Sequence, residues 1–130
     1  MQKLINDVKA FMQSCDQPIV EKPAMPGIRR QLLRMDLISE ELVELQIAVD
    51  NDDLVEIADA IGDSIYVLVG MAIEFGIPLA PVWDEIQRSN MAKVDPETGK
   101  VVKRKDGKVL KPEGWKSPDI AGIIDRAKEK

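Results

Sequence analysis

The stretch from Ile28 to Asp50 contains neither glycine nor proline, and this feature most constrains what the chain can fold into. Apolar residues recur in it at the spacing of one helix face, at Ile38, Leu42, Leu45 and Val49. A second periodic stretch, from about Leu54 to Phe75, follows a short turn of Asp and Asn residues and ends before Gly76. We therefore expect two long helices that pack antiparallel around that turn.

The remaining segments predict shorter elements. Apolar spacing indicates helices over Leu4–Met12 and over Leu79–Lys93, the second burying Val82, Trp83, Ile86 and Met91. A Lys-Asp-Gly-Lys turn between two valine-containing stretches indicates a small basic hairpin, and a short last helix is expected to be capped near Ser117 or Asp119. The fold class expected is all-α: one domain over residues 1–130, with a four-helix bundle-type core and a basic hairpin and tail over 94–130.

Composition excludes several classes of chemistry. The chain has no histidine, so Ser-His-Asp and Cys-His catalysis and histidine-ligated zinc are ruled out. Its single cysteine, Cys15, has no partner for an internal disulfide, and lysine and aspartate interrupt the first residues where a signal peptide is apolar. The longest apolar run, 64–73, is about half the roughly 20 residues of a membrane span. We expect a cytoplasmic protein with no membrane partner.

Charge is distributed unevenly along the chain. The formal net charge is −5, but residues 93–116 hold eight Lys and Arg against four Asp and Glu, which leaves −9 elsewhere. An acidic body with a basic arm is unlike a duplex-DNA binder, and no nucleic-acid partner is expected. It suits an anionic small molecule if cations neutralise the acids.

Two groups of carboxylates lie on faces that continue apolar stripes. At about 100° per residue, Glu40, Glu41 and Glu44 share one face of the helix over 28–50. The next helix places its own acids within about 60° of one another, at Glu56, Asp59 and Asp63. Antiparallel packing brings the two groups together near the turn, where they repel unless a cation lies between them. Oxygen ligands suit Mg²⁺, and Mn²⁺ as a substitute.

Other interpretations of these residues remain open. The acids could be ordinary helix-surface charges, and Asp53 with Glu56 also fits an N-terminal capping box. The basic arm could be a solubilising hairpin, and Asn90 a helix C-terminal residue. The whole chain would then be a non-catalytic helical interaction module.

Three segments carry a resemblance to a known superfamily. Ser39–Leu45 (SEELVEL), Asp53–Val67 and Phe75–Ile77 resemble the ExxE…ExxD signature of the all-α nucleoside-triphosphate (NTP) pyrophosphohydrolases, which include MazG, dimeric dUTPases and phosphoribosyl-ATP pyrophosphohydrolase. Asp84–Val94 and Asp106–Lys111 are similar to a bacterial and phage subgroup whose helical core is followed by a basic loop. The resemblance covers nearly the whole chain, although Gln87 stands where the subgroup often has histidine.

The resemblance implies roles for particular residues. The Mg²⁺ ligands would be Glu41, Glu44, Glu56 and Asp59. Glu40 would be the base that activates water, and Asp63 either a further ligand or a residue that orients one. Asn90 and Lys93 would contact the nucleotide, and the charge of the arm adds Lys108 and Lys111 as partners of the outer phosphates.

The implied activity is Mg²⁺-dependent hydrolysis of a nucleoside or deoxynucleoside triphosphate to the monophosphate and pyrophosphate, in control of the nucleotide pool. Hydrolysis of phosphoribosyl-ATP in histidine synthesis is the alternative within the superfamily. Because residues 65–73 are apolar on every side of their helix, we also expect a homodimer or homotetramer that covers them.

Overall fold

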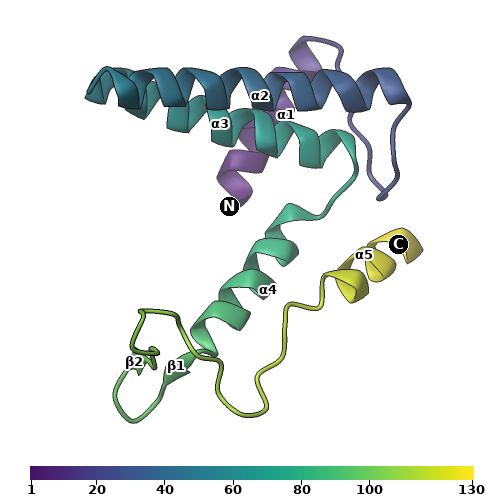
Figure 1. Cartoon of the computed structure of the whole chain (residues 1–130). Coiled ribbons are helices and arrows are strands. Elements are labelled where there is room, and N and C mark those ends of the chain that lie inside the picture. Colours follow the sequence, from purple (N-terminus) through teal and green to yellow (C-terminus); the bar gives the residue numbers. More distant parts are fainter.

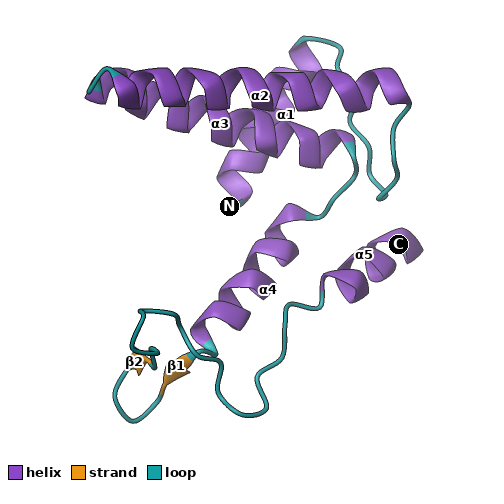
Figure 2. Cartoon of the chain, viewed as in Figure 1, coloured by secondary structure: helices purple, strands orange, loops and turns teal.

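The computed structural model describes residues 1–130 as five helices and one two-stranded antiparallel sheet (Figures 1 and 2). The helices are α1 (Gln2–Ser14), α2 (Ile28–Asp50), α3 (Leu54–Glu74), α4 (Leu79–Met91) and α5 (Ile120–Glu129), and the strands are β1 (Val94–Asp95) and β2 (Lys100–Val101). The all-α fold class predicted from the sequence is confirmed.

The long helices α2 and α3 run side by side in opposite directions, as the short turn between them predicted (Figure 1). The Asp53 side chain caps α3 by accepting a hydrogen bond from the backbone N–H of Glu56 at 3.1 Å. The preceding residue, Asp52, has a φ of 51°, which lets the chain reverse within a few residues. The turn thereby fixes the register of the two helices near their acidic residues.

The face that α2 buries matches the predicted one only in part, with Ile38 and Leu45 half-buried. Leu42 and Val49 are about half exposed, whereas Arg34 and Ala48 are buried. Glu41 is half-buried and lies on the same stripe as these two, because positions 34, 41 and 48 are seven residues, or about two turns, apart. A charged side chain therefore occupies the middle of the stripe that faces α3.

The apolar core lies where α1 crosses α3. It contains Val8 and Met12 of α1 with Val69 and Ile73 of α3. Only part of the apolar second half of α3 is buried here, since Leu68 on the same helix remains 51% exposed. The segment that the sequence predicted to be surrounded is therefore covered only in part within a single chain.

Charged side chains, most of them buried, connect α2 and α3 at the end of the pair away from the turn that joins them. The fully buried Glu74 carboxylate accepts hydrogen bonds from Arg30 at 2.6 and 2.8 Å and from Arg34 at 2.9 Å. Arg34 also donates to Gln17 at 3.0 Å. Its guanidinium fits because Gly70 has no side chain: a Cβ there would lie 2.7 Å from Arg34 Nη1.

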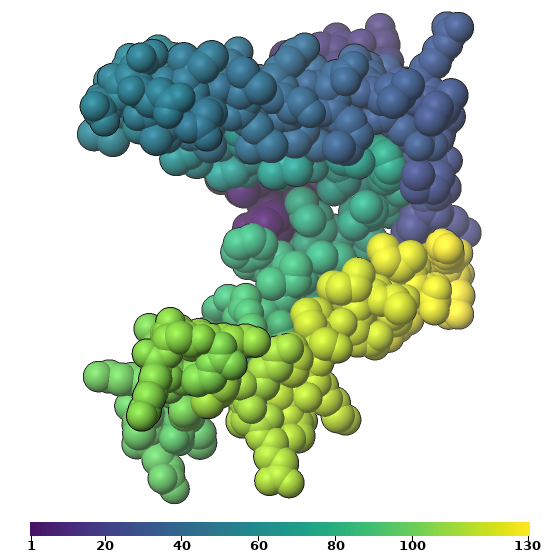
Figure 3. Space-filling model, in the orientation of Figure 1, coloured from purple at the N-terminus to yellow at the C-terminus, as the bar shows by residue number.

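The second half of the chain extends away from the α1–α3 layer (Figures 1 and 3). Helix α4 contacts α5, and it does not lie along α2. Three of the four α4 residues predicted to be buried are therefore exposed: Trp83, Ile86 and Met91, while Val82 is half-buried. This prediction was wrong for the single chain, because no element of the same chain packs on that face.

Two local predictions in this half are confirmed. The Asp-Gly turn closes a hairpin, with a bridge between Lys103 and Val109 and a φ of 90° at Gly107. The Asp119 side chain caps α5 by accepting a hydrogen bond from the backbone of Gly122 at 3.0 Å.

The chain exposes more surface than its mass requires. Its accessible surface is 9339 Å², whereas a compact monomer of 14.5 kDa has roughly 6,900 Å². The excess includes many large apolar side chains on α2, α3 and α4. No single helix is both long and apolar enough to cross a membrane; α3 and α4 would be so only together, and a bend of 116° separates them.

Candidate active site

Carboxylates of α2 and α3 converge near the turn that joins the two helices. One oxygen each from Glu41, Glu44 and Asp63 lie within 4.8 Å of one another. The structure therefore places Asp63, which the sequence left open between two roles, beside two of the four predicted ligands.

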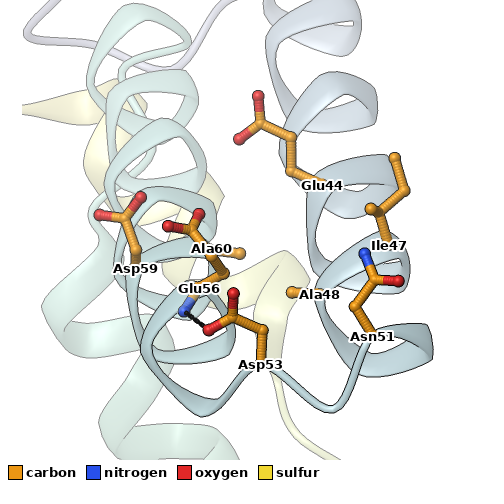
Figure 4. Close-up of a pocket in the computed structure, with 8 residues that line it drawn as sticks. All are labelled: Glu44, Ile47, Ala48, Asn51, Asp53, Glu56, Asp59 and Ala60. Carbon is orange, nitrogen blue, oxygen red and sulfur yellow. Dashed lines mark hydrogen bonds between the residues drawn. The ribbon is translucent and has the colours of Figure 1, made fainter.

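The other two predicted ligands lie next to this cluster. Glu56 and Asp59 of α3 line a pocket of about 160 Å³ together with Glu44 of α2, and small side chains, Ala48 and Ala60, leave room between the helices. Figure 4 shows these three carboxylates around the space between the helices, with Asp53 capping α3 below them. All five acids thus lie along one stretch of the α2–α3 contact.

Burial and mutual repulsion act on Glu41. Burial raises the pKa of its carboxyl, and the negative charges of Glu44, Asp63 and Asp59 raise it further. Its Oε2 atom is buried without a hydrogen-bond partner. A buried oxygen that lacks a donor and faces like charges is costly unless a cation approaches it.

The donor set fits a hard divalent cation. Every group in the cluster is a carboxylate oxygen, the ligand type that Mg²⁺ and Mn²⁺ prefer. The unpartnered Glu41 oxygen supplies a coordination position that no protein donor competes for. Glu41, Glu44 and Asp63 are thus the residues best placed to hold the ion, with Asp59 and Glu56 beside them.

Glu40, the predicted base, lies on an adjacent surface. It is exposed and lines a shallow depression on α2 with Asp36, Ser39, Val43 and Glu44. Because Glu44 borders this depression as well as the pocket, Glu40 is next to the carboxylate cluster but outside it.

The predicted substrate contacts lie in the other half of the molecule. Asn90 and Lys93 are at the end of α4, where Lys93 Nζ donates to Asn90 Oδ1 at 3.1 Å. Lys108 and Lys111 follow in the hairpin segment. Within one chain these four residues are not brought to the carboxylates, since α4 projects away from the α2–α3 pair (Figure 1).

Sequence reasoning missed one residue in this group. The Trp115 ring lies 5.3 Å from Lys93 Nζ and 4.7 Å from Lys111 Nζ, measured to the ring centroid. Only the aromatic residue itself, next to a Pro-Glu-Gly turn in a basic segment, could have suggested it. Lys93, which follows α4, is too distant from Trp115 in sequence for their contact to be predicted from local spacing.

Comparisons with known proteins identify the family of this chain. The family model described as phosphoribosyl-ATP pyrophosphohydrolase matches residues 8–90, the part that contains all the predicted acids. The chain is 26% identical, with a TM-score of 0.56, to the crystal structure of a "putative NTP pyrophosphohydrolase" from Exiguobacterium sp. 255-15, covering 97% of this chain and 96% of that one.

A curated relative is similar over a shorter stretch. The "Uncharacterized protein L479" of Acanthamoeba polyphaga mimivirus is 55% identical over 47 residues, which are 36% of this chain and 19% of the relative's length. The family match spans more than half of the chain, and the fold agrees with it. The chain therefore belongs to the phosphoribosyl-ATP pyrophosphohydrolase family, within the MazG-like superfamily of all-α NTP pyrophosphohydrolases.

Proposed function

We propose that the protein hydrolyses nucleoside or deoxynucleoside triphosphates to the monophosphate and pyrophosphate, with Mg²⁺ as its metal and Mn²⁺ as a substitute. The observation that carries this proposal is the convergence of Glu41, Glu44 and Asp63 beside the pocket of Glu56 and Asp59. The whole arrangement lies inside the region that matches the family.

The residues have distinct tasks in this reaction. Bound at the cluster, Mg²⁺ would supply Lewis-acid stabilisation of charge on the triphosphate. Glu40 accepts a proton from the attacking water as its oxygen forms a bond to the α-phosphorus. The bond from the α-phosphorus to the bridging oxygen breaks, and pyrophosphate leaves with both electrons of that bond. Asn90, Lys93, Lys108 and Lys111 neutralise and orient the nucleotide.

The positions of these groups support an arrangement of more than one subunit. The basic residues and the carboxylates do not meet within one chain, and the excess surface is roughly 2,400 Å² relative to a compact monomer. That area suits an obligate homodimer, in which each partner loses about 1,000–2,500 Å². We therefore include a homodimer or homotetramer in the proposal, with one subunit's arm near another's acids.

Two substitutions separate the metal ligands from the base. Glu56→Gln is expected to abolish both Mg²⁺ affinity and turnover, whereas Glu40→Gln is expected to retain Mg²⁺ affinity and to lower kcat by about 10²–10⁴-fold. Asp125→Asn, which removes an exposed acid of α5, is the matched control. Calorimetry with Mg²⁺ and a pyrophosphate-release assay give both readouts. Wild-type turnover in Glu56→Gln would overturn the carboxylate site.

A second candidate substrate is phosphoribosyl-ATP, because the matching family model carries that description. The overlap of nearly the whole chain with a structure described as an NTP pyrophosphohydrolase favours the triphosphates instead. Measuring kcat/KM for phosphoribosyl-ATP beside a panel of common and modified triphosphates decides between them. If none of these compounds is hydrolysed in Mg²⁺ or Mn²⁺, the proposed activity is wrong and the alternative of a non-catalytic interaction module is favoured.

A further inference from the structure

The end of α4 and the segment after the hairpin form a cationic cluster around one aromatic ring. Lys93 Nζ lies 5.3 Å and Lys111 Nζ 4.7 Å from the centroid of Trp115. Because both distances are measured to the same point, the two nitrogens are at most 10.0 Å apart. Neither lysine forms an ion pair in the structure, so two positive charges are held close together without a counter-charge.

The ring is fixed in place by the main chain of α4. Trp115 Nε1 donates to the carbonyl oxygen of Ser89 at 2.8 Å. That carbonyl is one of the last four of α4, and the helix supplies no donor for it because Lys93 N–H bonds to Asn90 instead. A turn in which Trp115 N–H bonds to Pro112, with Gly114 at a φ of 77°, sets the direction of approach. The cluster is therefore built by specific contacts between segments distant in sequence.

None of the four acids of the arm, Glu113 included, forms an ion pair with Lys93 or Lys111. Asp106 is paired with Arg104, and Asp95 accepts from the backbone of its own turn at Glu97. Cation–π contact with the ring positions each ammonium and leaves its charge available. The local surplus of positive charge remains for an external anion.

We propose that Lys93, Lys111 and Trp115 form a metal-independent binding site for a polyphosphate chain, either free or as the tail of a nucleotide. Two ammonium groups on one ring match an anion that carries charge on successive phosphates, while a single monovalent anion satisfies only one of them. The inference rests on the proposed function for Lys93 and Lys111 as phosphate partners, and it adds Trp115 and binding without metal. All three residues lie outside the matched family region.

The test uses Trp115 as its own reporter. The chain has two tryptophans, so Trp83→Phe leaves only the ring in the site. In EDTA at constant ionic strength, inorganic tripolyphosphate is expected to change Trp115 fluorescence in a saturable way. Adding Lys93→Ala and Lys111→Ala should weaken the Kd by about tenfold or more. The matched control, Lys100→Ala with Lys105→Ala, removes the same charge from the same arm and should change the Kd less than about twofold.

Further arms identify the ligand and separate this site from the hydrolytic one. ATP without metal should bind about as tightly as tripolyphosphate, and Glu56→Gln should leave both affinities unchanged. Trp115→Leu, followed by calorimetry and checked for helix content, should weaken binding although both lysines remain. Any of four results would overturn the proposal. They are an equal loss of affinity in the two double-lysine variants, binding of ATP but not of tripolyphosphate, tighter binding of a single-stranded oligonucleotide, and no saturable binding.

Discussion

Glu41 places a half-buried carboxylate in the stripe of α2 residues that faces α3. It occupies a stripe position between Arg34 and Ala48 that an apolar residue would fill in an ordinary helix pair. Burial and three neighbouring carboxylates raise the pKa of its carboxyl, and Oε2 has no donor. In the absence of metal, the folded state therefore carries an unfavourable interaction at this residue.

The first prediction follows from that interaction. Glu41→Gln keeps the shape of the side chain and removes its charge, so in EDTA the variant should be more stable than the wild type by about 1 kcal/mol. Millimolar Mg²⁺ should raise the Tm of the wild type and not that of the variant. Thermal unfolding followed by circular dichroism measures both, with the exposed Glu97→Gln as control. A variant less stable than the wild type in EDTA would contradict the repulsion argument.

The second prediction concerns Glu74. Burial would raise the pKa of its carboxyl, but hydrogen bonds and charge from Arg30 and Arg34 outweigh burial and hold the pKa below the ordinary value of 4.5. Glu74→Gln leaves two arginines without their anion, so it should cost about 3–5 kcal/mol of unfolding free energy at pH 7. Because the folded pKa is lowered, this difference is complete above pH 4.5 and shrinks as pH falls below it.

Urea denaturation at several pH values measures this difference. Glu129→Gln, an exposed acid in α5, should show no such dependence. A difference between wild type and Glu74→Gln that stays constant from pH 7 to pH 3 would show that the ion cluster contributes nothing through charge.

At the residue scale, the sequence predicted the acids better than it predicted their grouping. Spacing along the helix predicted that Glu41 and Glu44 share one face of α2. It predicted the same for Asp59 and Asp63 on α3. Which oxygens come within 4.8 Å depends on the rotation and register of α2 against α3, and that is a property of the packed pair. Spacing alone left Asp63 open for this reason.

At the scale of elements, two glycines of α3 give a matched test of how the helices meet. A Cβ at Gly62 would meet no neighbouring atom within 4 Å, whereas at Gly70 a Cβ would lie 2.7 Å from the Arg34 guanidinium. Gly62→Ala should stabilise the protein by about 0.5–1 kcal/mol, because alanine lowers the entropy of the unfolded chain. Gly70→Ala gains the same helix propensity but displaces Arg34 from hydrogen bonds to Glu74 and Gln17.

The third prediction is thus that the two substitutions change the free energy of unfolding in opposite directions. Gly70→Ala should destabilise by about 1–2 kcal/mol, since the lost charge-assisted hydrogen bonds exceed the gain in propensity. Chemical denaturation of both variants beside the wild type measures it. If both substitutions stabilise equally, Arg34 moves aside without cost and the ion cluster does not define the helix spacing.

The existence of the helices, and the bounds of α2 and α3 to within one residue, were predictable because their signals are local. The glycine- and proline-free stretch, the cap at Asp53 and Gly76 beyond α3 all act within a few residues. Gly76 has a φ of 66° and lies so close to the Lys22 backbone that no side chain fits. The Arg34–Glu74 pair was missed because its members are 40 residues apart, and the α4 burial was wrong because burial depends on what packs against the helix.

At the scale of the whole molecule, the exposed apolar faces are the main unsatisfied surface of the single chain. Trp83, Ile86 and Met91 of α4 and Leu68 of α3 are each at least 40% exposed. Single exposed apolar residues are common on monomers. Several large exposed apolar residues, in a chain whose accessible surface exceeds that of a compact monomer by roughly 2,400 Å², are typical of a subunit of an oligomer. In the proposed homo-oligomer, these faces are the surfaces that a second copy of the chain would cover.

The last prediction tests that assembly. In light scattering at tens of micromolar, the protein should have at least twice its chain mass of 14.5 kDa. Ile86→Glu introduces a charge on the exposed apolar face of α4 and should shift the protein towards the monomer, because a charge without a partner is unfavourable in an interface core. Gln87→Glu adds the same charge to the next residue, which is already polar and exposed, and should leave the mass unchanged. A monomeric wild type would show that these faces stay in solvent, and the basic arm and the acids would then have to meet within one chain.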